Sequence, residues 1–181
     1  MLKAVILTLL VFAPISMAQN SPYPKEIRGY KVERAVVEVK KTDQVENDLV
    51  KFGDPTLVSA TPLGIRLEIP VVVAPVKQKG KVDFLVFEQM MINGTPVQIE
   101  DYRHKFKLPT NKELVLQRPL RLYIYLPNAI LAALGEWTAS KEAWLVTGRI
   151  YVFGEFKKLL FNFKRCIPIE LNLTMRNPLR Q

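Results

Sequence analysis

The stretch Leu120-Arg121-Leu122-Tyr123-Ile124-Tyr125-Leu126 alternates between aliphatic side chains and polar or aromatic ones. Successive side chains of a β-strand point to opposite faces of its sheet, so a period of two predicts a half-buried strand. The same alternation recurs in Tyr102–Leu108, Ile65–Ile69 and Ile167–Leu173. In Tyr102–Leu108 it places His104 on the apolar face and the basic residues on the other. The chain is therefore predicted to consist mainly of strands.

Turn-forming residues separate these segments from further β-rich runs. Such runs cover Val36–Val39, Phe84–Met91 and Ala143–Phe153. Asn93-Gly94 predicts a two-residue hairpin, because Asn and Gly tolerate the positive φ of a type I′ turn. Phe153–Phe156, which contains Gly154-Glu155, is predicted to be a second tight reversal.

The spacing of these runs predicts about eight or nine strands, typical of an antiparallel β-sandwich of the immunoglobulin or fibronectin III type. Val71–Val73 is apolar on both faces and is expected to be a central strand. The stretch Thr42–Pro62 lacks a clear period and is expected to be a surface loop. One short helix is expected at residues 129–134, between a cap at Asn128 and a stop at Gly135.

The first eighteen residues have the pattern of a cleaved signal peptide. Lys3 precedes the apolar run Ala4–Phe12, and Ser16 and Ala18 supply the small residues of a cleavage site. The run is shorter than the ~20 residues that span a bilayer. We expect residues 19–181 to form a single domain with no transmembrane segment, located in the periplasm or secreted.

Composition excludes several classes of protein. Of 181 residues 49% are apolar, and 26 Lys and Arg against 17 Asp and Glu give a net charge of +9; disordered chains have fewer apolar residues. A single Cys and a single His argue against a disulfide scaffold and a multi-histidine metal site. We expect no cofactor, and we expect Cys166 to be a buried thiol.

Basic residues concentrate in the second half of the mature chain. Residues 19–100 hold 11 basic and 11 acidic side chains, whereas residues 101–181 hold 14 basic and 6 acidic ones. This excess predicts a surface for an anionic envelope component or protein partner, although a lysine-rich strand face also prevents edge-to-edge aggregation. Nucleic acid is not expected for an exported chain whose aromatic residues resemble core. The candidate surface comprises Arg103, Lys105, Lys107, Lys157, Lys158, Lys164 and Arg165.

No catalytic motif stands out, and we do not expect an enzyme. An inward-facing His104 is more typical of a hydrogen-bonded core residue than of a general base. Carboxylates such as Asp83 and Glu88 could serve a hydrolase only if the fold brought them together. Trp137 and Trp144 could stack on a sugar, but ordinary packing is the more common role.

Five segments together share a pattern with a known family: they are Leu63–Ile69, Val82–Met91, Ile92–Val97, Lys107–Pro109 and Leu145–Ile150. In this order they resemble the WHy domain, the water-stress and hypersensitive-response module of LEA type 2 proteins. The resemblance extends over about residues 30–173. It implies a fibronectin-like β-sandwich without catalytic residues and a binding or protective role in envelope or desiccation stress.

Two functions are therefore expected. The first is an exported, non-enzymatic β-sandwich of the cell envelope with a binding or protective role. The alternative is a structural accessory subunit of a periplasmic assembly, such as a secretion or motility machine, recruited through a basic surface or an exposed edge strand.

Overall fold

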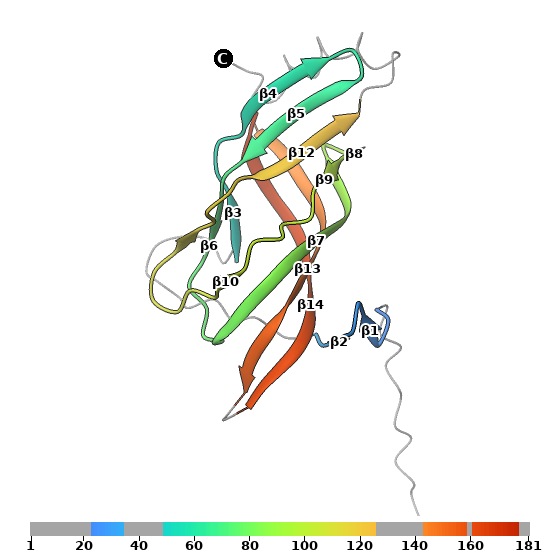
Figure 1. The fold of residues 1–181 in the computed structure, drawn as a ribbon. Helices are drawn as coiled ribbons and strands as arrows, with labels where there is room; N and C mark the ends of the chain where they lie inside the picture. Colours follow the sequence, from blue (N-terminus) through green and yellow to red (C-terminus); the bar gives the residue numbers. More distant parts are fainter. Residues whose placement is uncertain (1–22, 35–48, 126–142, 159–160, 178–181) are drawn as a thin grey trace, which may run out of the picture.

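The computed structural model describes residues 23–34, 49–125, 143–158 and 161–177, and the side chain of Lys158 lies outside this description. Every regular element in these ranges is a strand (Figure 1). The largest unit is a seven-stranded sheet, here called the main sheet. It runs in the order β1 (Glu26–Ile27), β2 (Tyr30–Val32), β14 (Phe161–Arg176), β13 (Ala143–Lys158), β7 (Gly80–Ile92) and β10 (Phe106–Lys107), with β8 (Thr95–Pro96) paired to β7.

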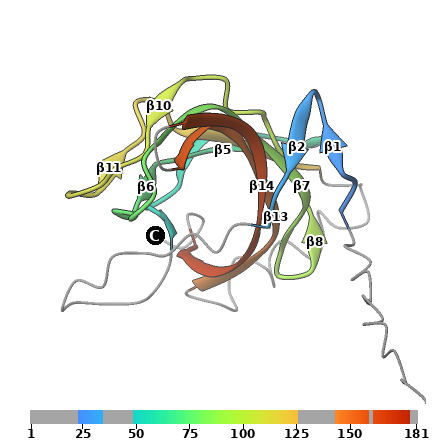
Figure 2. The same ribbon diagram turned by 90° about the horizontal axis from the view of Figure 1, so that it is seen from below.

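Two smaller sheets cover the inner face of the main sheet (Figure 2). Side chains from all three sheets form one buried core, which includes Leu67, Val73, Leu85 and Ile150. The protein is thus an all-β, layered structure of the β-sandwich kind; its placement in the immunoglobulin or fibronectin III class stays a prediction. The three-stranded sheet has the order β11 (Leu114–Val115), β6 (Val71–Val73), β3 (Val50–Phe52), and the four-stranded sheet has the order β4 (Thr56–Thr61), β5 (Gly64–Ile69), β12 (Leu120–Tyr125), β9 (Gln98–Ile99).

The long hairpin of β13 and β14 is the centre of the main sheet. The two strands pair without a break from Ala143 opposite Arg176 to Lys158 opposite Phe161. Strand β7 runs along the other side of β13, and its register shifts twice. Each shift places an extra residue in β7, which bends the strand. The bends let β7 follow the curved hairpin seen in Figures 1 and 2.

The predicted reversal at Phe153–Phe156 is wrong, because β13 continues straight through Gly154 and Glu155. Gly154 lies at the second register shift, where a Cβ atom would stand 2.3 Å from the carbonyl oxygen of Lys81. The glycine therefore permits the close approach of two strands at a bulge. A strand glycine and a turn glycine look alike in sequence, which explains the error.

Most of the predicted alternation is confirmed. Strand β12 buries Leu120, Leu122 and Ile124 and leaves the side chains between them accessible. The Asn93-Gly94 turn has φ values of 48° and 82°, as a type I′ turn requires. The central position of β6, between β11 and β3, is also confirmed.

The prediction that His104 faces the core is wrong. Tyr102 forms only an isolated bridge with Leu85, and regular pairing resumes at Phe106. The chain leaves the ladder between these points, so the period of two is lost, and His104 is exposed. Its ring instead lies edge-on to Tyr102, with centroids 5.4 Å apart.

The expectation that Thr42–Pro62 forms a surface loop is also wrong for the part of this range that the structure describes, because β3 and β4 lie there. Strand β4 is exposed along nearly all its length, so no apolar face repeats in its sequence. Other expectations lie outside the described residues: the signal peptide at 1–18, the strand Val36–Val39, residues 42–48 and the short helix at 128–135. No helix in the described part is long and apolar enough to cross a membrane.

The N-terminal hairpin covers the outer face of the main sheet. Strands β1 and β2 turn at Arg28 and Gly29, and β2 then pairs in parallel with Arg165 and Cys166 of β14. A second apolar cluster lies beneath this hairpin. Its buried members are Val86, Tyr151, Phe153 and Cys166. The main sheet is therefore covered on both faces around Phe153 and Cys166.

Replacing Gly154 by Ala is expected to lower the free energy of unfolding by about 1–3 kcal/mol, because its methyl group would push two paired strands apart. The matched control is Gly29→Asn, at a φ of +78° that Asn tolerates and with no atom within 4 Å of an added Cβ. The control should change stability by no more than about 0.5 kcal/mol in urea unfolding. Equal stability of Gly154→Ala and the wild type would contradict the bulge.

Candidate functional site

The two faces of the main sheet carry different candidate sites. The outer face has a charged hollow, with a volume of about 600 Å³, beside the N-terminal hairpin. The inner face has a narrow apolar cleft of about 50 Å³ between the main and three-stranded sheets. The hollow is lined by Arg28, Tyr30, Asp83, Phe84, Asp101, Arg103, Lys105, Glu155 and Lys164.

Arg28 reaches the hollow from the turn between β1 and β2. Its guanidinium lies 3.4 Å from Asp101 Oδ2 and 5.8 Å from the centre of the Phe84 ring. Arg103 contacts the same carboxylate oxygen at 3.5 Å. Arg28 has a φ of 50°, a conformation that favours Gly or Asn. The arginine thus takes a less favoured backbone conformation at the turn, from which its side chain contacts Asp101.

Asp83 forms the other side of the hollow. It is the extra residue of β7 at the second register shift, opposite the step from Phe153 to Gly154. The Tyr30 hydroxyl donates a hydrogen bond to Asp83 Oδ2 at 3.1 Å, and Lys105 Nζ lies 3.5 Å from Oδ1. Burial and this carboxylate raise the pKa of Tyr30 above its ordinary value of 10.0. The bulge thus turns a carboxylate toward the N-terminal hairpin and anchors β2.

Lysines extend the positive surface beyond the hollow. Lys81 pairs across the sheet with Lys107 on one side and with Glu155 on the other. Because cross-strand partners share a face, both lysines lie on the face of Glu155 and of the hollow. Lys157 lies on this face as well, because it follows Glu155 by two residues on β13. Among the described residues no carboxylate forms an ion pair with Lys81, Lys107, Lys157 or Lys164.

We call this surface the basic face. It combines seven basic side chains with three acidic ones, so an excess of positive charge remains after the local ion pairs. The basic members are Arg28, Lys81, Arg103, Lys105, Lys107, Lys157 and Lys164, and the acidic members are Asp83, Asp101 and Glu155.

The structure brings together part of the surface predicted from the sequence. Arg103, Lys105 and Lys164 line the hollow, and Lys107 and Lys157 lie on the same face. Arg165 does not, because it follows Lys164 in a strand and so takes the opposite side; it pairs instead with Glu33 at 2.7 Å. The side chain of Lys158 lies outside the described residues.

Sequence reasoning missed Arg28 and Lys81. Arg28 lies in the alternating stretch Glu26–Val32, whose Arg-Gly turn is a usable hairpin signal. Lys81 lies next to a predicted strand, but only strand pairing places it opposite Lys107. The expectation that the aromatic residues near the end of the long hairpin are core is wrong for Phe161, which is 66% exposed.

The structure does not bring the candidate catalytic carboxylates Asp83 and Glu88 together in one site. Asp83 lines the hollow, whereas Glu88 is exposed and does not line it. Trp144 is fully buried, which confirms a packing role, and Trp137 lies outside the described residues. No group of three His, Cys, Asp or Glu side chains within the described ranges could hold a metal ion.

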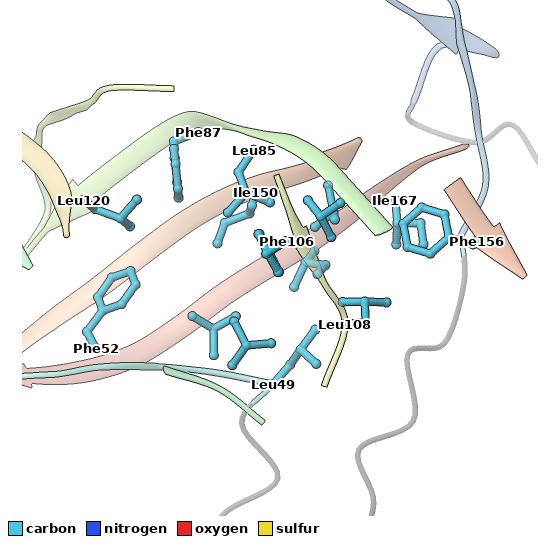
Figure 3. A pocket seen from close by; sticks show the side chains of 15 residues that line it. Leu49, Phe52, Leu85, Phe87, Phe106, Leu108, Leu120, Ile150, Phe156 and Ile167 are labelled. Atoms are coloured by element: carbon cyan, nitrogen blue, oxygen red, sulfur yellow. The ribbon is translucent and has the colours of Figure 1, made fainter. Parts of the chain in front are cut away.

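The apolar cleft is lined entirely by aliphatic and phenylalanine side chains (Figure 3). Water in such a cavity finds no hydrogen-bond partner, so the space stays dry. An empty volume of this size costs about 1 kcal/mol of folding free energy. The lining residues are Leu49, Val50, Phe52, Val73, Val82, Leu85, Phe87, Phe106, Leu108, Leu120, Ile150, Val152, Phe156, Ile167 and Ile169.

A polar cluster fixes the start of the described N-terminal segment on the outer face. Tyr23 donates a hydrogen bond to Glu170 Oε1 at 2.5 Å, and Arg149 Nε contacts the same oxygen at 2.8 Å. The Arg149 guanidinium also lies 4.8 Å from the centre of the Tyr23 ring. The Tyr23 bond and, more weakly, Arg149 lower the pKa of Glu170.

Cys166 lies fully buried under the N-terminal hairpin, as predicted. Burial, with a smaller contribution from Glu88, raises the pKa of this thiol from 9.0 to about 12. A thiol in this state is unreactive, because the thiolate is the nucleophile.

Comparison with protein-family models finds no match, and comparison with curated proteins finds none. A crystal structure of a protein from Archaeoglobus fulgidus is similar to the chain with a TM-score of 0.32 and 13% identity. The alignment covers 72% of this chain and 98% of that one. A likeness of this size bears on neither topology nor function.

Native Cys166 should react with a thiol reagent at pH 8 at least about 100-fold more slowly than the unfolded chain, because reaction requires opening of its cover. Tyr30→Ala, which removes part of that cover, should raise the native rate. The control Tyr125→Ala removes a tyrosine that is 58% exposed, on β12, and should leave the rate unchanged. Equal rates for both variants would contradict a local cover.

The same thiol gives stability a dependence on alkaline pH. Between about pH 9 and pH 12 the unfolded chain releases the proton while the folded chain retains it. The unfolded state then binds fewer protons, so stability falls as pH rises through this window. In urea unfolding, Cys166→Ala should show a smaller fall than the wild type; identical pH profiles would contradict the raised pKa.

Proposed function

We propose that the protein is an exported, non-enzymatic β-sandwich of the cell envelope that binds an anionic envelope component through the basic face. The observation that carries this proposal is the unpaired positive charge on one side of the main sheet. Clustered cations of one sign attract an oppositely charged partner and speed its association.

The direct opposition of Lys81 and Lys107 strengthens the argument. Like charges at paired positions of neighbouring strands destabilise a sheet. Lys107 has no carboxylate partner among the described residues, and Lys81 has only the cross-strand neighbour Glu155, beyond ion-pair distance. An anionic partner bound over both ammonium groups would remove this repulsion.

The resemblance to WHy domains supports a protective role for the same surface under water stress. The periplasmic or secreted location rests on the signal-peptide pattern of residues 1–18.

A structural accessory role is the second candidate, and strand β4 favours it. This strand is the edge of the four-stranded sheet as described, and Thr56–Thr61 contains no charged residue. Leu57 and Val58 on it are 45% and 50% exposed. Exposed edges usually carry charges or prolines that prevent pairing with other chains. A fixed partner that co-purifies and is lost in Val58→Lys would favour this candidate.

Lys81→Gln combined with Lys107→Gln should raise stability and weaken anion binding together. Removing the opposed charges should raise the free energy of unfolding by up to about 1 kcal/mol. The same change should lower the salt concentration at which the protein elutes from immobilised heparin, because fewer cations contact the polyanion.

The control is Arg66→Gln combined with Lys112→Gln, which removes two exposed charges from residues that do not line the hollow or share a pocket with Arg103. It has the same net charge as the first double variant, so overall charge is matched. If both variants elute at the same salt concentration, binding reflects total charge alone and the proposed site is wrong.

A further inference from the structure

The end of the β13–β14 hairpin extends past the neighbouring strand of the main sheet. Strand β7 accompanies β13 only as far as Gly80, the partner of Phe156. The last cross-strand pairs of the hairpin lie beyond this point and end with Lys158 opposite Phe161. Figure 1 shows this end of the hairpin projecting away from the two smaller sheets. The hairpin therefore presents Phe161 at one end of the described structure.

Phe161 is an aromatic side chain held out in water. It is 66% exposed, more than any other large apolar side chain in the described ranges. It shares a face of β14 with Phe163, two residues on, and the two ring centroids are 6.4 Å apart. Phe163 is partly buried and pairs across the hairpin with Phe156, which is buried. This row of rings holds Phe161 roughly 7 Å beyond the part of the hairpin that β7 accompanies.

Lysines gather at the same end of the molecule. The backbone N–H of Lys157 donates a hydrogen bond to the carbonyl of Lys79 at 2.8 Å, and Lys81 pairs across the sheet with Lys107. Lys164 belongs to the hairpin itself. We call these five residues the lysine cluster. No carboxylate in the part of the chain that the structure describes forms an ion pair with any of them.

The hairpin end is amphipathic. Because cross-strand partners share a face, Lys164 lies on the outer face with Glu155, and Phe163 lies on the inner face with Phe156. The hairpin end is a single layer of sheet, so a flat partner that meets it contacts the side chains of both faces. The segments that meet at this end contain no Asp or Glu; they are residues 77–81, 105–108, 156–158 and 161–165.

This combination of side chains selects a lipid bilayer among anionic partners. An amphipathic segment binds a bilayer by burying apolar side chains at the boundary of the acyl chains while its lysines contact the headgroups. An acidic polysaccharide would contact the lysines but would leave the Phe161 ring in water. Lysine is a compact charge on a flexible stem, which suits mobile headgroups, whereas arginine suits a fixed, bidentate partner.

We infer that this end of the protein docks on an anionic phospholipid bilayer, with Phe161 inserted at the boundary of the acyl chains and the lysine cluster against the headgroup phosphates. The electrostatic part of this inference rests on the proposed function, because Lys81, Lys107, Lys157 and Lys164 also belong to the basic face. The insertion of Phe161 is independent of that function.

Sedimentation with vesicles of equal parts phosphatidylglycerol and phosphatidylcholine tests the aromatic part. Phe161→Thr should weaken binding by about tenfold, because less apolar area leaves water. The matched control is Leu63→Thr, which changes a side chain that is 64% exposed in the turn between β4 and β5, at the opposite end of the molecule (Figure 1). It should bind like the wild type. All variants keep the same N-terminal residues, so the apolar run at residues 4–12 affects them equally.

The lysine cluster is tested with the same vesicles. Lys79→Gln combined with Lys157→Gln should weaken binding by about tenfold or more, because each lysine near an anionic bilayer contributes to attraction. Arg66→Gln combined with Arg176→Gln removes two exposed charges from β5 and from the other end of β14, and should bind like the wild type. Circular dichroism and urea unfolding establish that all variants fold.

Phe161→Trp reports insertion directly. Relative to the wild type, its fluorescence should shift to shorter wavelength on anionic vesicles, whereas that of Leu63→Trp should not. A bound Phe161→Trp without this shift would overturn the inference, as would equal vesicle affinity in Phe161→Thr and Leu63→Thr.

Heparin elution separates this inference from the proposed function. Phe161→Thr should elute at the wild-type salt concentration, because heparin offers no apolar phase. A protein that binds heparin through Lys81 and Lys107 but never sediments with anionic vesicles would overturn the lipid inference alone. Vesicle binding that depends on Phe161, together with heparin elution that ignores Lys81 and Lys107, would overturn the proposed function alone.

Discussion

The pairing of β13 with β14 is the constraint on which the rest of the structure depends. Sixteen residues of each strand face one another in unbroken register, from Ala143 opposite Arg176 to Lys158 opposite Phe161. Strand β7 attaches to one side of this hairpin and β2 to the other. Both candidate sites use its side chains, because Lys164 belongs to the outer hollow and Ile167 to the inner cleft.

The alternation of side chains in β14 gives the hairpin two buried faces. Cys166 points into the cluster under the N-terminal hairpin, and its neighbour Ile167 points into the space between the sheets. Each face has its own chemistry as a result. The outer face combines an aromatic cluster with cations, whereas the inner face is purely apolar.

Sequence alone predicted the strands that have one buried face and one accessible face. Strand β12, β5 and the second half of β14 follow a period of two because each separates core from solvent. Strand β4 could not be predicted this way, because an edge strand exposed on both faces has no period. The run through Phe153 and Cys166 is buried on both faces, so it too lacks a readable pattern.

The candidate sites were predicted only in part. The basic residues of Arg103–Lys107 and Lys164 could be named from charge, but pairing decides which of them share a face. Arg165 and Lys164 are adjacent in sequence and lie on opposite sides of a strand. The cleft could not be predicted from the sequence, because its lining residues are apolar like those of any core. Which residues line the cleft is determined by the packing of strands that lie far apart in the sequence.

Native-state amide hydrogen exchange tests the central claim most directly. If the β13–β14 hairpin organises the fold, amides of Ile150–Phe153, which lie between β7 and β14, exchange last and only through global unfolding. Amides of β4 exchange much earlier. Slowest exchange in β5 and β12, with β13 opening at a lower free energy, would contradict the account.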